Sequence, residues 1–163
     1  MLQIQHLIDG EAVKSGSGRV GPVFNPATGE QTGQVDLASV TEVDATVASS
    51  KAAFAEWRNV SIARRTKLLY TFRNLVVENA DEIARRLTAE HGKVGDDARG
   101  EVARGIENIE FACGFAHTLE GRYSEQASTG VDVYTVRQPV GVCAGITPFN
   151  FPAMVPLWML PNA

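Results

Sequence analysis

The stretch from residue 140 to residue 152 constrains the fold of this chain more than any other. It opens with the small apolar run at residues 140–146 (VGVCAGI), which predicts a strand buried on both faces, as in a parallel sheet. A turn follows at residues 147–150, and Phe151-Pro152 then opens a helix, with the proline where its missing N–H does no harm. One buried strand cannot form a sheet, so we expect a truncated chain in which residues 151–163 expose apolar surface.

This strand, turn and helix unit is also the best functional candidate. Ligands in open α/β sheets bind beyond the carboxyl ends of the strands, which here means residues 145–152. Residues 140–163 contain neither the GxGxxG dinucleotide fingerprint nor the GxxxxGK[ST] phosphate loop. The pattern therefore predicts a site without naming its ligand.

Upstream of this unit, the sequence predicts a β-ribbon followed by helices. Asp9-Gly10 between short apolar runs is a strong hairpin signal, because both turn positions need positive φ. Residues 23–37 predict two strands around a turn, and residues 131–136 alternate as a half-exposed strand. Helices are expected to begin near Thr41, Ser61, Asn79 and Asp96, with capping boxes at Thr41/Asp44 and Asn79/Glu82 and a left-handed cap at Gly92.

The helix expected from about Asp96 to Glu120 carries two stripes of residues on different sides. Arg104 lies on the second stripe, on a partly apolar wall where an arginine is costly without an anionic partner. That partner is either a ligand carboxylate or a glutamate of the same helix, Glu101 or Glu107. The first stripe comprises Ala98, Val102, Ile106, Ile109, Cys113 and Ala116, and the second comprises Arg104, Asn108, Phe111 and Phe115.

Composition excludes several classes of protein. With 163 residues, 44% hydrophobic and 21% charged, the chain is globular rather than disordered or fibrous. A net charge of -4 with scattered basic residues gives no footprint for nucleic acid or an anionic membrane. The start of the chain has no targeting pattern, and its apolar end is too short and proline-broken to span a bilayer. Small-molecule chemistry or protein association remains, and we expect a soluble, cytoplasmic protein.

The metal-binding and nucleophilic side chains form no recognisable constellation. Cys113 and Cys143 make no CxxC pair and lack zinc-site spacing, so we expect a reducing environment and two structural cysteines that behave as small hydrophobes. His6, His91 and His117 form no HxxxH pair. We therefore expect no metal site.

Residues 145–152 (GITPFNFP) resemble the aldehyde dehydrogenase motif Pro-(Trp/Phe)-Asn-Phe-Pro. Phe149 in place of the tryptophan, together with residues 101–108 (EVARGIEN), is similar to the CoA-acylating methylmalonate-semialdehyde branch. The resemblance covers essentially the whole chain. It implies an α/β fold with a β-ribbon, helices and extended strands that lead into the first strand of an incomplete Rossmann-like cofactor domain.

The resemblance also implies a division of the chain and an assembly. Residues 1–122 would form the ribbon and the helical part, residues 123–139 extended strands of the oligomerisation type, and residues 140–163 the first strand, turn and helix of the NAD-binding sheet. The full-length family forms homotetramers, so a homo-oligomer is expected.

The site residues are carried over one by one from the resemblance. Asn150 would donate its side-chain amide to the oxyanion, with the backbone N–H of a nucleophilic cysteine beyond Ala163 as second donor. Thr147, Phe149 and Ile146 would line the nicotinamide-ribose side of an NAD site. Arg104 would pair with the carboxylate of a semialdehyde. From spacing alone, Asn150 is an ordinary cap residue before a helix.

The implied reaction is NAD-dependent oxidation of methylmalonate or malonate semialdehyde through a cysteine thioester, with loss of carbon dioxide and transfer of the acyl group to coenzyme A. The products would be propanoyl-CoA or acetyl-CoA, and this chain would be inactive alone. Two alternatives remain open. One is a hydrolytic semialdehyde dehydrogenase, which releases a free acid. The other is a non-catalytic assembly module that pairs through its exposed strand edges.

Overall fold

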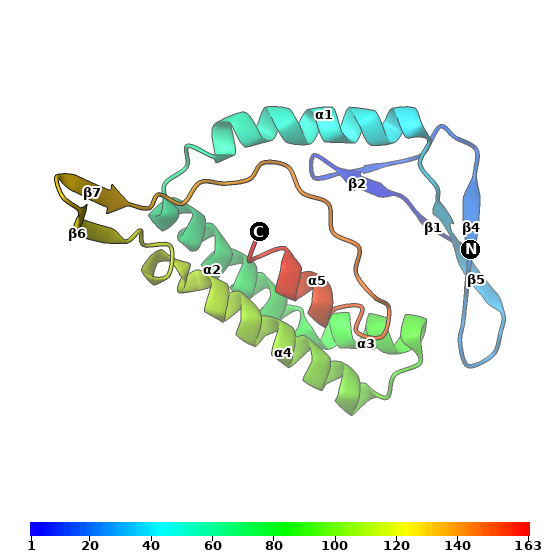
Figure 1. Cartoon of the computed structure of the whole chain (residues 1–163). Coiled ribbons are helices and arrows are strands. Elements are labelled where there is room, and N and C mark those ends of the chain that lie inside the picture. Colours follow the sequence, from blue (N-terminus) through cyan, green and yellow to red (C-terminus); the bar gives the residue numbers. More distant parts are fainter.

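The computed structural model describes all 163 residues as a mixed α/β chain (Figure 1), which confirms the predicted class. Helices α2, α3 and α4 pack together, α5 lies against α4, and α1 lies on the opposite side of the molecule. The strands are β1 Leu2–Ile4, β2 His6–Ile8, β3 Glu11–Val13, β4 Val20–Phe24, β5 Gln31–Asp36, β6 Tyr123–Ser128 and β7 Val131–Tyr134. The helices are α1 Val40–Trp57, α2 Ile62–Glu78, α3 Ala80–His91, α4 Gly95–Cys113 and α5 Met154–Met159, with a 3₁₀ turn at Phe115–His117.

The N-terminal ribbon forms as the turn residues predict. β2 and β3 pair antiparallel around Asp9 and Gly10, whose φ angles are 53° and 80°. A second sheet has the order β1-β5-β4, with β1 parallel and β4 antiparallel to β5. The hairpin prediction and the two-strand prediction for residues 23–37 are therefore confirmed.

The N-terminus of α1 is capped two residues earlier than predicted. The capping box consists of Ser39 and Glu42, so the Thr41/Asp44 box is wrong. The Glu42 carboxylate also accepts hydrogen bonds from the backbone N–H of Gly16 (2.7 Å) and the hydroxyl of Ser15 (3.0 Å). Backbone N–H groups of Ser39 and Gly16, with the Ser39 hydroxyl, lower the pKa of Glu42 to about 2. The box thus ties α1 to the loop that follows β3.

Stability should depend on pH through Glu42. Its folded pKa is depressed from 4.5 to about 2, so its contribution is present above about pH 5 and is lost as the pH falls through this window. We expect the thermal unfolding temperature to decrease as the pH is lowered from about 6 to about 3. The decrease should be smaller for Glu42→Gln. Circular dichroism melts measure this, with Asp44→Asn on the exposed side of α1 as the charge-matched control. Parallel curves for the wild type and Glu42→Gln would contradict the prediction.

The other helix boundaries give a mixed result. Ser61 caps α2 and Gly92, at φ 81°, ends α3, as predicted. The Asn79/Glu82 box is wrong, because the Asn79 side chain donates to Leu75 O (2.8 Å) of the preceding helix. α2 runs almost directly into α3, so Asn79 closes the first helix, while Glu82 binds Arg85 and Arg86.

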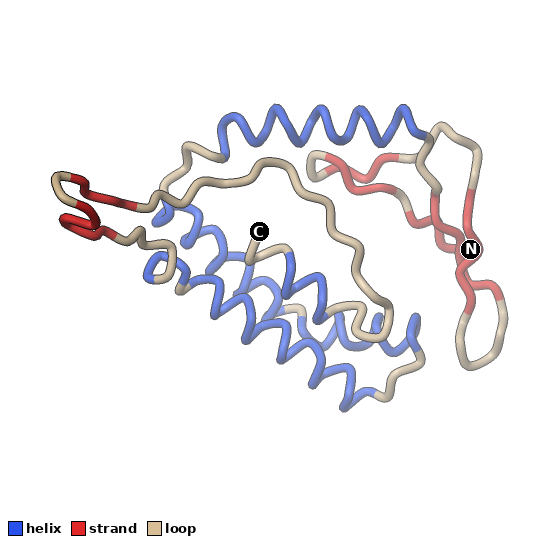
Figure 2. The backbone as a smooth tube through the Cα atoms, viewed as in Figure 1, coloured by secondary structure: helices blue, strands red, loops and turns tan.

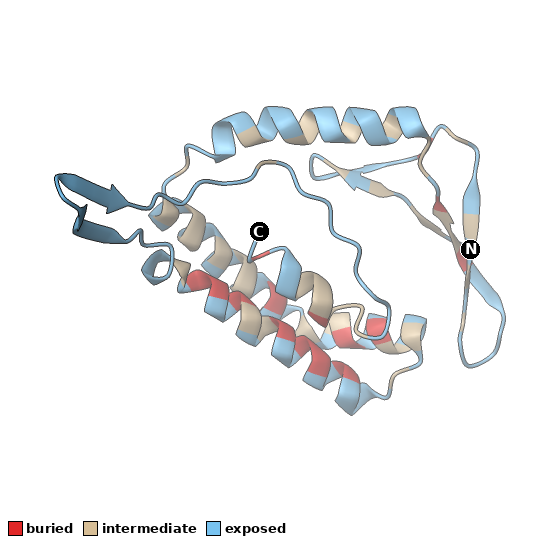
Figure 3. Ribbon diagram, viewed as in Figure 1, coloured by how far each residue is buried: buried red, intermediate tan, exposed pale blue.

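The core is centred on α4 (Figure 3). Four members of the first predicted stripe are buried, and Ile106 is half-buried, so this stripe is confirmed up to the end of the helix. The helix ends at Cys113 rather than near Glu120, and Ala116 is exposed. The four buried members of the stripe are Ala98, Val102, Ile109 and Cys113.

None of the helices combines the length and the apolar character that crossing a bilayer requires.

The predicted strand at residues 140–146 does not form. Residues 135–148 are a long extended segment without strand partners (Figure 2), and Val140 and Ile146 are 92% and 96% exposed. The physical reason is that a strand needs a neighbour to satisfy its backbone groups, and no strand of this chain lies beside the segment. The prediction that residues 151–163 expose apolar surface is confirmed in part: Trp158, Met159 and Leu160 are exposed, whereas Met154 is buried because α5 packs on α4.

The strand predicted at residues 131–136 is β7. It pairs with β6 in a hairpin that projects from one end of the molecule (Figure 1). Both strands are exposed on both faces, so the predicted half-exposed strand is wrong in its burial, because no other element packs on the hairpin. This hairpin falls within residues 123–139. The three-part division of the chain stays a prediction.

Candidate functional site

The predicted motif residues lie at the end of the extended segment and in the turn that leads into α5. Ile146, Thr147, Phe149 and Asn150 are all exposed, and the side chain of Asn150 makes no hydrogen bond within the chain. The Phe149 ring packs against His91, the last residue of α3, with 5.5 Å between ring centroids. The turn is thus attached to the helices through its backbone and Phe149, and it presents the Asn150 amide freely.

Arg104 lies on the exposed side of α4. In this structure Arg104 forms no ion pair with Glu101 or Glu107, and Glu101 binds Lys93 instead. The next residue, Gly105, packs on Leu157 of α5, so Arg104 lies beside the contact between α4 and the motif helix. Its guanidinium remains available to a ligand anion.

Glu101 and Lys93 fix the motif segment against α4, and the sequence analysis did not predict this role for either residue. Glu101 Oε1 accepts hydrogen bonds from the backbone N–H groups of Ala153 (2.8 Å) and Met154 (3.0 Å). Glu101 Oε2 binds Lys93 Nζ at 2.5 Å. One signal was available: Glu101 follows Ala98 by three residues, which places it in the buried register of the first stripe.

The charge state of Glu101 fits a holding role. Burial raises the pKa of its carboxyl, but the hydrogen bonds from Lys93, Met154 and Ala153 outweigh that effect and hold the pKa below its usual value. A carboxylate held in its charged form by three donors is a poor general base at neutral pH. We therefore assign Glu101 no proton-transfer role.

Helix α5 also contacts α4 beyond Glu101. The Asn108 amide lies 3.5 Å and 3.4 Å from the carbonyl oxygens of Leu157 and Trp158, so α4 meets polar groups at both ends of the short helix. Between them, Gly105 lets α5 approach, because a Cβ at this position would lie 2.5 Å from Leu157 Cδ1 and 3.2 Å from its Cβ. Asn108 was predicted on the second stripe, and here it supports the motif helix.

Gly105→Ala should destabilise the chain. The added methyl must displace Leu157, and overpacking of this kind costs about 1–3 kcal/mol of unfolding free energy. Gly100→Ala on the same helix meets nothing within 4 Å, so it should be neutral or stabilising by about 0.5–1 kcal/mol. Denaturant titrations of both variants measure the difference. Equal stability of the two variants would contradict the packing of α5 on Gly105.

The two cysteines differ in their surroundings. Cys113 is buried on α4, and burial, with a smaller contribution from Glu110, raises the pKa of its thiol. A buried thiol of raised pKa is a structural residue, as predicted. Cys143 was expected inside a strand but is exposed in the extended segment, because that strand does not form.

The residues predicted to line the nicotinamide-ribose side of an NAD site lie together in one exposed stretch of the chain. The backbone N–H and C=O groups of Ile146, Thr147 and Phe149 make no hydrogen bonds within the chain, so they are free to bind a polar ligand. Their exposure leaves room for a planar ring beside the turn. These residues supply only one wall of such a site.

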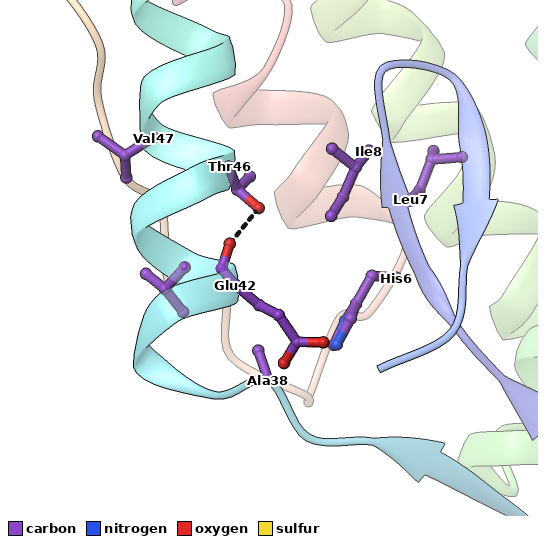
Figure 4. A pocket seen from close by; sticks show the side chains of 8 residues that line it. His6, Leu7, Ile8, Ala38, Glu42, Thr46 and Val47 are labelled. Atoms are coloured by element: carbon purple, nitrogen blue, oxygen red, sulfur yellow. Dashed lines mark hydrogen bonds between the residues drawn. The ribbon is translucent and has the colours of Figure 1, made fainter. Parts of the chain in front are cut away.

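A cavity of about 270 Å³ lies elsewhere, between the β2–β3 hairpin and α1 (Figure 4). None of the predicted site residues lines it. Its only acidic side chain, Glu42, is already engaged by Ser39, Ser15 and Gly16, and Thr46 Oγ1 donates to the Glu42 carbonyl at 2.8 Å. The cavity therefore belongs to the packing of α1 rather than to a catalytic centre. Its lining comprises His6, Leu7, Ile8, Ala38, Glu42, Val43, Thr46 and Val47.

Comparison with known proteins identifies the family of the chain. Residues 12–163 match the model of the aldehyde dehydrogenase family. The chain belongs to this family. It is 47% identical over 160 residues to the malonate-semialdehyde dehydrogenase of Pseudomonas aeruginosa, covering 98% of this chain and 32% of that enzyme. It is 45% identical over 161 residues to the acylating, mitochondrial methylmalonate-semialdehyde dehydrogenase of Arabidopsis thaliana, covering 99% of this chain and 26% of that enzyme.

Solved aldehyde dehydrogenase structures share the fold. A Sinorhizobium meliloti protein in complex with NAD superposes with a TM-score of 0.94 at 46% identity, covering 99% of this chain and 33% of that one. The methylmalonate-semialdehyde dehydrogenase of Oceanimonas doudoroffii gives a TM-score of 0.93 at 48% identity, with the same coverage. The chain thus has the fold of part of an aldehyde dehydrogenase and spans about a third of the length of these relatives.

Proposed function

We propose that this chain contributes to the NAD-dependent, CoA-acylating oxidation of malonate or methylmalonate semialdehyde, with decarboxylation to acetyl-CoA or propanoyl-CoA. The observation that supports the proposal most is the 45–47% identity to enzymes for these two semialdehydes over nearly the whole chain. The acylating character of the A. thaliana enzyme supports the use of coenzyme A. The exposed β6–β7 hairpin is the proposed subunit contact of a homo-oligomer.

Each proposed site residue has one task in this reaction. Asn150 donates its amide to the oxyanion that forms when a cysteine thiolate, supplied from outside this chain, attacks the aldehyde carbon. Arg104 binds the substrate carboxylate through its paired donors. Ile146, Thr147 and Phe149 hold the nicotinamide side of NAD, which when bound supplies the hydride acceptor. Neither Cys113 nor Cys143 is proposed as the nucleophile, so the 163 residues alone should be inactive.

The test uses a chimera in which residues 1–163 replace the matching part of the P. aeruginosa enzyme. NADH formation is followed with malonate semialdehyde, with and without coenzyme A. We expect CoA-dependent turnover by the chimera, acetyl-CoA as product, and none from the isolated chain. Release of free acid without coenzyme A would favour the hydrolytic alternative. A folded but inactive chimera would favour the assembly alternative.

A further inference from the structure

A carboxylate is buried directly beneath the motif turn. The side chain of Glu101 is 1% exposed, and both of its oxygens accept hydrogen bonds, from Lys93 and from the first residues of the α5 segment. Burial of an unpaired carboxylate costs several kcal/mol, so such a group persists only where its partners stay in place. Glu101 therefore restrains the positions of Ala153 and Met154 relative to α4.

Lys93 extends this restraint to Asn150 itself. Its side chain is 13% exposed, and its ammonium donates to the Asn150 carbonyl oxygen at 3.1 Å and lies 4.2 Å from the centre of the Phe151 ring. An ammonium has three donors, and two of them serve Glu101 and Asn150. The lysine thus joins the buried carboxylate to the backbone of the residue that carries the amide.

The Asn150 side chain has no other support. Its amide makes no hydrogen bond within the chain, so within this chain only the position of its backbone limits where the amide can reach. That backbone is fixed by Lys93 at its carbonyl, and three residues later by Glu101 at Ala153. An oxyanion donor works only within hydrogen-bond distance of the developing charge, and a misplacement of about 1 Å costs about 10²-fold in rate.

We propose that Glu101 and Lys93 are positioning residues for Asn150, with the buried carboxylate orienting the lysine and the lysine fixing the backbone of the oxyanion donor. The inference rests on the proposed function of Asn150 as that donor. Helix capping alone would need only the Glu101 contacts to Ala153 and Met154. The bond from Lys93 to Asn150 is what links the pair to the reaction.

The test compares Glu101→Gln, Lys93→Met and the double variant in the chimera. Glu101→Gln keeps an oxygen for the N–H groups of Ala153 and Met154 but turns an amide toward Lys93. We expect kcat to fall about 10–100-fold, with KM for the aldehyde within about twofold. Hydrogen exchange in peptides covering residues 150–156 should become faster. Glu107→Gln, an exposed glutamate on the same helix, is the matched control and should change nothing.

The double variant separates positioning from stability. Replacing both charges removes the unpaired ammonium, so the melting temperature should recover relative to Glu101→Gln, while kcat stays low because the Lys93→Met side chain has no donor for the Asn150 carbonyl. Recovery of kcat together with stability would overturn the proposal, as would unchanged kcat and exchange in Glu101→Gln. Asn150→Ala is measured in parallel. If this variant keeps full kcat, both the proposed function and this inference fail. If Asn150→Ala is impaired while Glu101→Gln stays active, only the inference fails.

Discussion

Asn150→Ala should lower the kcat of the chimera by about 10²–10³-fold, because loss of one oxyanion donor removes about 3–4 kcal/mol of transition-state stabilisation. The Asn150 amide makes no hydrogen bond within the chain, so its removal should leave the fold intact. KM for the aldehyde should change little, since the charge that the amide stabilises develops only after attack. Steady-state NADH formation and a thermal melt measure both parts of the prediction.

Asn150→Asp is the shape-matched companion to this variant. It keeps the size of the side chain but replaces the donor with a negatively charged acceptor, so it should be at least as impaired as Asn150→Ala. Activity within about threefold of the parent for Asn150→Asp would show that the amide donates nothing in the transition state. Asn150 would then be only an ordinary cap residue before a helix.

The predictions from sequence that were confirmed depend on local chemistry. The Asp9-Gly10 turn and the Gly92 cap both require positive φ, which these residues supply wherever the surrounding chain is placed. The first stripe of α4 was recognisable because a helix that packs on neighbouring helices repeats its apolar residues every three or four positions. Such features need no information about distant residues.

The features that the sequence did not predict depend on distant partners. Residues 140–146 have the composition of a buried strand, but no strand of this chain pairs with them, so they remain extended and exposed. Glu101 was considered only as a partner for Arg104, since the two are three residues apart on one helix. Its true partners are Lys93, eight residues away and outside the helix, and the N–H groups of Ala153 and Met154, which only tertiary packing brings near.

Because Glu101 pairs with Lys93, it does not pair with Arg104, whose guanidinium remains free. Replacing Arg104 should therefore have the second large effect on activity. In the chimera, Arg104→Leu should lower kcat/KM for malonate semialdehyde by about 30–150-fold, because the hydrogen bonds of a guanidinium to a carboxylate contribute about 2–3 kcal/mol. Propanal, which has no carboxylate, should react as well as before or better. Steady-state kinetics with both aldehydes measure this change in selectivity.

Arg99→Leu is the control for Arg104→Leu, because Arg99 lies on the same helix and its guanidinium pairs with Asp81 and Asp96 instead of remaining free. It removes the same charge from α4, so a general electrostatic attraction for anionic substrates would weaken equally in both variants. Selective loss in Arg104→Leu alone would locate the carboxylate at residue 104. Equal loss for both aldehydes in Arg104→Leu would mean that the arginine supports the fold of α4, and substrate choice would then have to be set by residues outside this chain.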